Sequence, residues 1–125
     1  MKIMKYDLLL EYDSNTRGCT GWFFFSISNT FKDNIVTINI LNMSFNQKLY
    51  LMGMQPLIFS MKSFVKHKIG WHRAGFDIFY FKERLEKERH HNNEIRYFYT
   101  LRFSYRFKYE HDIVFFSAGY PYPFS

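Results

Sequence analysis

The sequence has only one cysteine, Cys19, among its 125 residues. A single thiol can form neither an intramolecular disulfide nor a metal site built from several cysteines. This cysteine usage fits a reducing compartment better than a secreted domain held together by disulfides. We therefore expect a cytoplasmic protein.

Long apolar runs are also missing. Uncharged stretches such as 18–31 and 49–61 are interrupted by Gly, Asn, Gln or Pro and fall short of the roughly 18 apolar residues that a membrane helix needs. Residues 1–7 include both Lys and Asp and have no apolar core followed by small residues, so they do not resemble a signal peptide. We expect no membrane partner.

Acidic residues are in the minority, since 11 Asp and Glu stand against 17 Lys and Arg and give a formal net charge of +6. Apolar residues make up 47% of the chain and aromatic residues 22%, which excludes the composition of a disordered protein. The length suits one domain with its own core, and we expect residues 1–125 to form it. The positive charge allows attraction of an acidic partner that weakens as the salt concentration rises.

Apolar and polar residues alternate along 96–109, where Tyr, Leu or Phe occupies every odd position from Tyr97 to Tyr109. Successive residues of a strand point to opposite faces, so this pattern predicts a strand with a buried aromatic face and a basic outer face. Further runs rich in aromatic or β-branched residues predict strands at 6–12, 22–28, 34–43, 48–52, 77–81 and 112–118.

Clusters of Gly, Asn, Asp and Ser separate these runs and predict turns. Short strands at this spacing, without repeated helices, predict an all-β fold: an antiparallel β-sandwich of about seven to nine strands. One charged loop excursion is expected at 82–94, whose composition is helical but whose only apolar residue is Leu85, so it has no face to bury. A short helix is expected at 60–67, capped by the Ser60 hydroxyl.

Few residue clusters have the pattern of a catalytic or metal site. His91-Asn92-Asn93-Glu94 matches the His-x-x-Glu pair that supplies two zinc ligands in one class of metallopeptidase. No third ligand stands in a convergent motif, and the pair lies in the charged excursion, so a solvated loop is the favoured interpretation. Cys19 has no recognisable partner base and is interpreted as structural. We predict no catalytic residue, no metal ligand and no cofactor in this chain.

The mixture of basic and aromatic residues raises the question of nucleic-acid binding, which needs cations and stacking rings on one surface. Along 96–109 the arginines and most of the rings fall on opposite faces, and only Phe98 shares the basic face. The pattern therefore argues against a nucleic-acid partner.

Several blocks along the chain resemble a known family. The first runs from Asp13 to Phe23 and has the pattern Asp-x-Asn-Thr-x-Gly-x-Thr-x-Trp-Phe. It is followed, in the family's order, by Gly53-Met54-Gln55-Pro56-Leu57, Gly70-Trp71-His72-Arg73-Ala74-Gly75, Tyr99-Thr100-Leu101-Arg102-Phe103 and Tyr120-Pro121-Tyr122. Together these blocks resemble the N-terminal β-sandwich domain of the cytosolic carboxypeptidases, zinc enzymes that trim glutamates from tubulin.

The resemblance implies an accessory role. In this family the zinc ligands, the substrate-clamping arginines and the catalytic glutamate belong to a carboxypeptidase domain that begins just after the Tyr-Pro-Tyr block, where this sequence stops. The chain is then expected to be non-catalytic and to pack against a carboxypeptidase domain normally in the same chain, with zinc in that domain and glutamate-rich tubulin tails as a further partner. The alternative is an autonomous binding module whose basic, aromatic surface holds an acidic protein, a glycan or a nucleic acid.

The end of the matching region supplies candidate contacts with a neighbouring domain. These residues are Tyr120, Pro121, Tyr122 and Phe124.

A second set of candidates is structural or electrostatic. Trp71 is expected to anchor in the core, while the guanidinium of Arg73 meets a carboxylate or backbone carbonyls. The alternative for Arg73 is that it joins Arg102 and Arg106 in attracting a glutamate-rich tail toward a neighbouring active site.

Overall fold

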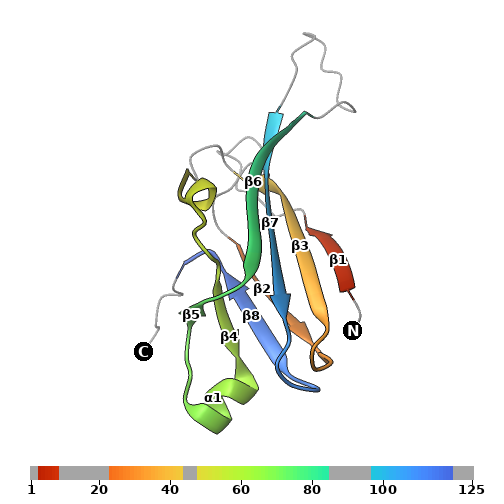
Figure 1. Cartoon of the computed structure of the whole chain (residues 1–125), viewed down its shortest axis with the longest axis vertical. Helices are drawn as coiled ribbons and strands as arrows, with labels where there is room; N and C mark the ends of the chain where they lie inside the picture. Colours follow the sequence, from red (N-terminus) through yellow and green to blue (C-terminus); the bar gives the residue numbers. More distant parts are fainter. Residues whose placement is uncertain (1–2, 9–22, 44–47, 85–96, 120–125) are drawn as a thin grey trace.

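A computed structural model of the chain describes residues 3–8, 23–43, 48–84 and 97–119 (Figure 1). These residues form eight strands, one 3-10 helix and one α-helix. In chain order the elements are β1 (Ile3–Leu8), β2 (Phe24–Ser28), β3 (Ile35–Met43), η1 (Lys48–Met52), β4 (Leu57–Ser60), α1 (Met61–His67), β5 (His72–Arg73), β6 (Phe76–Arg84), β7 (Tyr97–Arg106) and β8 (Ile113–Ser117).

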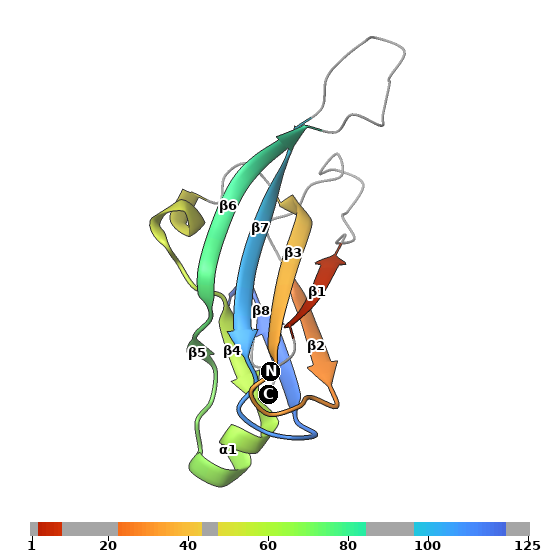
Figure 2. The same cartoon turned by 45° about the vertical axis from the view of Figure 1, so that its right-hand side comes forward.

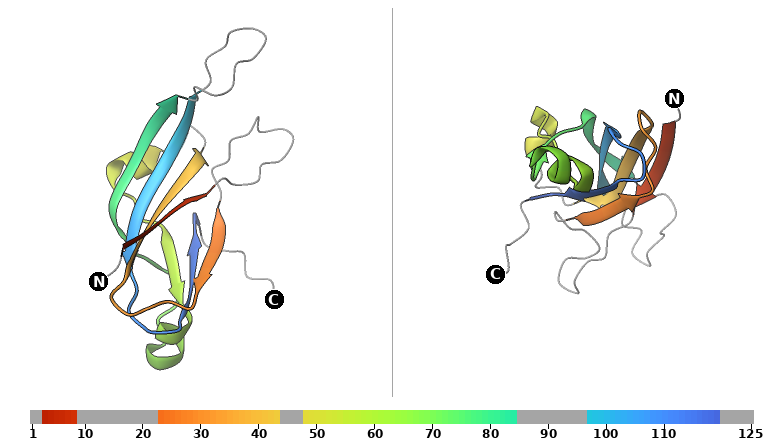
Figure 3. Two further views of the ribbon diagram at one scale, coloured as in Figure 1. Left: turned by 90° about the vertical axis from the view of Figure 1, so that its right-hand side faces the viewer. Right: turned by 90° about the horizontal axis from the view of Figure 1, so that it is seen from below.

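The strands form two layers, which Figures 2 and 3 show from further sides. The first sheet has the strand order β1-β3-β7-β6 and the second has the order β2-β8-β4-β5. This arrangement confirms the prediction of an all-β sandwich. Within the described residues, no helix has the length and apolar character needed to cross a membrane.

One strand pair departs from the expected antiparallel pattern, because β1 and β3 run parallel, with Ile3 beside Ile35 and Leu8 beside Ile40. Parallel neighbours need a long connection, and here β2 in the other sheet lies between them in the chain. Alternation along a strand reveals which residues share a face but carries no information about strand direction.

Two alternating sets of side chains fill the space between the sheets. Phe103 on β7 and its neighbour across the ladder, Ile38 on β3, are both fully buried. Phe116 faces them from β8, with its ring centroid 5.8 Å from that of Phe103. The expected inward aromatic face of the long strand is therefore confirmed, and Arg102 and Arg106 lie exposed on the other face.

The run 48–52 is η1, and the prediction of a strand there is wrong. Among residues 49–52 only Tyr50 is buried, packing on Tyr80 of β6 with ring centroids 6.0 Å apart, while Leu49 and Leu51 are exposed. The backbone N–H of Gly53 closes the turn on the Tyr50 carbonyl. So short a run satisfies strand and helical patterns equally, and packing against the edge of the first sheet decides between them.

The charged excursion begins later than expected. Residues 82–84 continue β6, where they pair with 97–99 of β7. They stay in the hairpin because a partner strand offers their backbone groups hydrogen bonds, whatever the charge of their side chains. The remainder of the predicted excursion, 85–94, lies outside the described residues.

The short helix α1 begins where the Ser60 hydroxyl predicts it. The backbone N–H of Ser63 donates to Ser60 Oγ over 3.1 Å, and that hydroxyl in turn donates to the buried carboxylate of Asp112. Asp112 also accepts hydrogen bonds from the backbone N–H groups of Lys62 (3.0 Å) and Ile113 (2.8 Å). One carboxylate thus fastens the start of α1 to the start of β8.

Replacing Asp112 with Ala should lower the free energy of unfolding by about 2–4 kcal/mol, because the buried Ser60 hydroxyl and two partly buried backbone N–H groups lose their acceptor. Urea unfolding followed by circular dichroism measures the loss. Glu110→Ala, two residues away and exposed, is the control and should change stability by less than about 0.5 kcal/mol. Equal stability of the two variants would contradict this account.

Burial raises the pKa of the Tyr105 hydroxyl to about 12, and Asp112 and Tyr109 act in the same direction. Because the folded-state pKa is raised, folding favours the protonated hydroxyl, and this stabilisation is complete below pH ~10 and lost as the pH rises toward ~12. The wild type should therefore lose up to about 3 kcal/mol of unfolding free energy between pH ~10 and ~12 through this hydroxyl, and Tyr105→Phe should not show that loss. Unfolding at stepped pH tests it, with the exposed Tyr6→Phe as control, and identical alkaline curves for wild type and Tyr105→Phe would refute it.

Candidate docking face

On its outer face the first sheet carries a group of hydrogen-bonded polar side chains from β1, β3 and β7. Thr37 and Ser104 are joined through their hydroxyls over 2.8 Å between β3 and β7. Asn39 Nδ2 donates to Asp7 Oδ1 over 2.9 Å, and Arg102 Nε donates to Asn39 Oδ1 over 2.6 Å. Polar groups from β1, β3 and β7 thus satisfy one another along this face.

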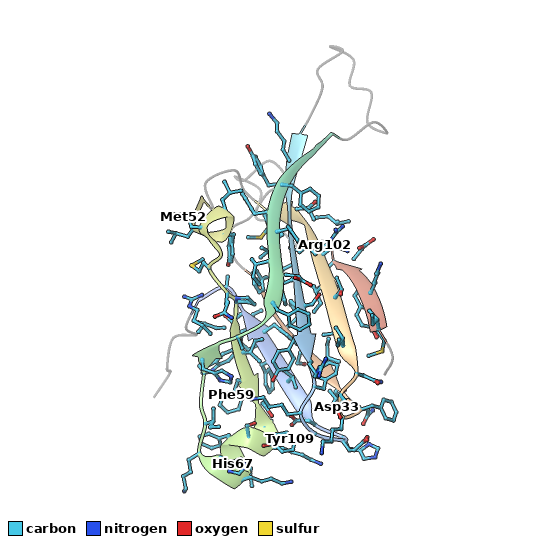
Figure 4. All side chains as sticks on the ribbon, viewed as in Figure 1. Asp33, Met52, Phe59, His67, Arg102 and Tyr109 are labelled. Carbon is cyan, nitrogen blue, oxygen red and sulfur yellow. The ribbon has the colours of Figure 1, made fainter. Side chains whose placement is uncertain are left out.

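The outer face of the second sheet is aromatic. Phe115 of β8 lies 6.0 Å from Phe24 of β2 and 6.2 Å from Phe59 of β4, between ring centroids. Trp71 lies 6.0 Å from Phe24 and 5.5 Å from Phe59, and Phe64 of α1 lies 5.3 Å from Phe59. We call this group the aromatic face: Phe24, Phe59, Phe64, Trp71 and Phe115. Figure 4 labels Phe59, beside β4 and above α1.

The aromatic face keeps substantial contact with solvent. Phe24 is 49% exposed and Phe64 is 48% exposed, while Phe59, Trp71 and Phe115 are half-buried. The ring planes of contacting pairs differ by 36–65°, so they do not form a flat platform for a sugar or a base. A contiguous apolar surface of this kind is typical of a protein interaction site.

Trp71 belongs to this face, and the expectation that it anchors in the core is wrong. The segment between α1 and β5 places its ring over the outside of the second sheet, against Phe24 and Phe59. The space between the sheets is already filled by other rings, among them Phe103 and Phe116.

Arg73 has the contact with a backbone carbonyl that the sequence suggests. Its Nη1 donates to the carbonyl oxygen of Gln55 over 2.7 Å, and Gln55 Nε2 donates to the carbonyl of Gly75 over 2.9 Å. Gly75 has φ +107°, and a Cβ there would lie 3.2 Å from the Ser104 carbonyl oxygen, so glycine suits this close approach. The arrangement ties the entry of β4 to β5.

The structure does not bring Arg73 together with Arg102 and Arg106. Arg73 lies on β5 of the second sheet, whereas the other two lie on β7 of the first sheet. The positive charge near the aromatic face has another source. Residues 61–73 contain Lys62, Lys66, Lys68 and Arg73 and no acidic residue.

Within the described residues, no group of three or more His, Cys, Asp or Glu side chains could hold a metal ion. The zinc that the family resemblance implies would therefore find no fitting ligand set in the part of the chain that the structure describes. Three predicted features lie outside these residues. They are the motif His91 to Glu94, Cys19, and the candidate contacts Tyr120, Pro121, Tyr122 and Phe124.

The aromatic face escaped sequence reasoning, although a signal for it was present. Two adjacent aromatic residues on a strand place one ring on each side of the sheet. Phe115-Phe116 and Phe24-Phe25 are such pairs. Phe116 and Phe25 face the core, so Phe115 and Phe24 lie on the outside of the sheet. Doubled rings on two paired strands therefore indicate aromatic surfaces on both sides of one sheet.

Comparison with known proteins gives a consistent set of relatives, although no family model matches the chain. It is 34% identical over 121 residues to human cytosolic carboxypeptidase 2 and 32% identical over 121 residues to mouse cytosolic carboxypeptidase 3. Cytosolic carboxypeptidase 1 of Xenopus laevis is 29% identical over 123 residues. Each match covers 97% of this chain but only 13%, 11% and 10% of the respective relative, so the chain spans about an eighth or less of their length.

Proposed function

Because the chain is homologous over nearly its whole length to a short N-terminal part of the cytosolic carboxypeptidases, we propose that it is a non-catalytic accessory domain that docks on a carboxypeptidase domain through the aromatic face. In this role it buries apolar surface of that domain and helps to hold its shape. The carboxypeptidase domain carries out the reaction, and the β-sandwich provides a surface on which that domain packs.

The observation that carries this proposal is the difference between the two outer faces. On β1, β3 and β7 the outer face of the first sheet carries polar side chains that bond to one another, as in Arg102–Asn39–Asp7. The second sheet leaves rings such as Phe24 and Phe64 about half exposed to water. Covering these rings with a partner removes apolar area from water, which favours association.

The position of the last strand supports the same face. β8 lies inside the second sheet, between β2 and β4, and its final residue Ser117 pairs with Phe24. In the resembling family the carboxypeptidase domain begins shortly after the segment that corresponds to β8. A domain tethered there starts next to the aromatic face.

The activity of the whole protein is part of the same proposal. Zinc and the catalytic groups would belong to the carboxypeptidase domain, and glutamate-rich tails of tubulin would be its substrate, in the cytoplasm. The relatives are named cytosolic carboxypeptidases, which agrees with that location. The present chain contributes binding surface and no reacting group.

A second candidate function is an autonomous module for an acidic protein. The basic segment 61–73, which flanks the aromatic face and has no acidic residue, favours it. Such binding would be driven by charge and would weaken steeply with salt, whereas docking through rings would not.

The test is to co-express the chain with the carboxypeptidase domain of human cytosolic carboxypeptidase 2 and to measure their affinity. Phe24→Ser combined with Phe64→Ser should weaken binding at least about tenfold, because two large rings leave the interface. The matched control is Phe31→Ser with Phe76→Ser, which removes rings of similar exposure (52% and 41%) outside the aromatic face, and it should change affinity less than about twofold.

Equal losses in the two double variants would contradict docking through the aromatic face. Absence of any binding to the carboxypeptidase domain would contradict the accessory role itself. Salt-sensitive binding of polyglutamate that disappears when Lys62, Lys66 and Lys68 are replaced by Ser would establish the second candidate instead.

A further inference from the structure

A hollow of about 480 Å³ follows β6, away from the aromatic face. Four consecutive residues of this strand, Ile78 to Phe81, line it, together with Tyr50 and Leu51 of η1 and Arg102 of β7. Figure 4 marks its surroundings through the labels on Arg102 and on Met52, the last residue of η1. β6 is an end strand of the first sheet, with a strand neighbour on one side only among the described residues.

Among the described residues that line the hollow, Arg102 is the only charged one, and its neighbours hold it in place. Its Nε donates to Asn39 Oδ1 over 2.6 Å, and its Cζ lies 5.3 Å from the centre of the Phe81 ring. Asn39 is buried, and Asp7 fixes the orientation of its amide by accepting a hydrogen bond from Nδ2. Asn39 and Phe81, the two contacts of the guanidinium described here, are both uncharged. Asn39 uses one of the five N–H donors of the guanidinium.

The other described residues of the lining are aromatic or aliphatic, and their rings contact one another. Tyr80 stacks on Tyr99 with ring centroids 5.0 Å apart and planes 12° apart, and the Tyr50 ring lies 6.0 Å from that of Tyr80. Two further apolar side chains of the lining are exposed: Phe79 is 53% exposed and Leu51 is 65% exposed. The hollow therefore joins one positioned cation to bulky apolar walls.

We propose that this hollow binds an extended peptide that carries a carboxylate beside a bulky apolar side chain. A peptide can add to the sheet beside an end strand such as β6, and the backbone hydrogen bonds of this pairing give affinity that does not depend on the peptide's sequence. The planar fork of Arg102 selects a carboxylate, and Phe79 and Leu51 take the neighbouring apolar group. A single cation among apolar walls suits one negative charge better than the two of a phosphate.

This site is independent of the proposed docking. The hollow lies on the first sheet and η1, whereas the aromatic face lies on the second sheet and α1. A failure of peptide binding would thus leave the accessory role untouched, and the reverse also holds.

Three fluorescein-labelled octapeptides, each alternating Thr and Val around a central pair, serve as probes for fluorescence anisotropy with the full chain. The first has Phe-Glu at its centre and an amidated C-terminus, the second has Phe-Gln at its centre and an amidated C-terminus, and the third ends in Phe with a free carboxylate. The first should bind at least about tenfold more tightly than the second. Comparison of the first with the third separates a side-chain carboxylate from a chain terminus as the recognised group.

Arg102→Gln should weaken the carboxylate peptides about tenfold or more and leave the Phe-Gln amide unchanged. The control is Arg106→Gln, which removes the same charge four residues along the same strand and should alter binding less than about twofold. Phe79→Ser should weaken all three peptides, because it removes the apolar wall. Circular dichroism and the melting temperature confirm that each variant is folded.

Three outcomes would overturn the proposal. Equal effects of Arg102→Gln and Arg106→Gln would mean that net charge alone attracts the peptides. Equal affinity for the Phe-Glu and Phe-Gln peptides would remove the role of the carboxylate. A chain that forms dimers through β6, lost on Phe79→Ser, would show that a second copy and not a peptide occupies the hollow.

Discussion

The contact between Phe103 and Phe116 joins the two sheets, and much of the surface follows from it. Both rings are fully buried, and each belongs to an inner strand of its sheet. Since successive residues of a strand point to opposite sides, an inward Phe116 requires an outward Phe115. Phe25 stacks on Phe116 over 5.1 Å from β2, and this contact turns Phe24 outward in the same way. The aromatic face is therefore a geometric consequence of the core.

The sequence predicts what depends on local periodicity. The two sheets, the long strand with its inward rings and the Ser60 cap of α1 all follow from spacing and from a single hydroxyl. The direction of β1 and the 3-10 turn at Tyr50 depend on contacts distant in sequence, and no local pattern specifies them. The same holds for Asp112, which meets Ser60 across 52 positions of the chain.

The candidate sites show the same difference between features set by the local sequence and features set by contacts distant in sequence. Arg73 donates to the backbone carbonyl of Gln55, which is close in sequence, and the donor-rich guanidinium predicts a contact of this kind. The turns expected at Gly70 and Gly75 predict an inward Trp71, yet its ring packs on Phe24 and Phe59 outside the second sheet. The positioned guanidinium of Arg102 depends on Asn39 and Asp7 from two other strands, a juxtaposition that only the folded sheet reveals.

Hydrogen exchange measured by mass spectrometry tests the central claim most directly, with the chain free and bound to the carboxypeptidase domain of human cytosolic carboxypeptidase 2. The account predicts slower amide exchange in β2, β4, α1 and β8, which carry the aromatic face, and unchanged exchange in β1 and β3. Slower exchange confined to β1, β3 and β7 would contradict it, because the polar outer face and not the aromatic one would then be the docking surface.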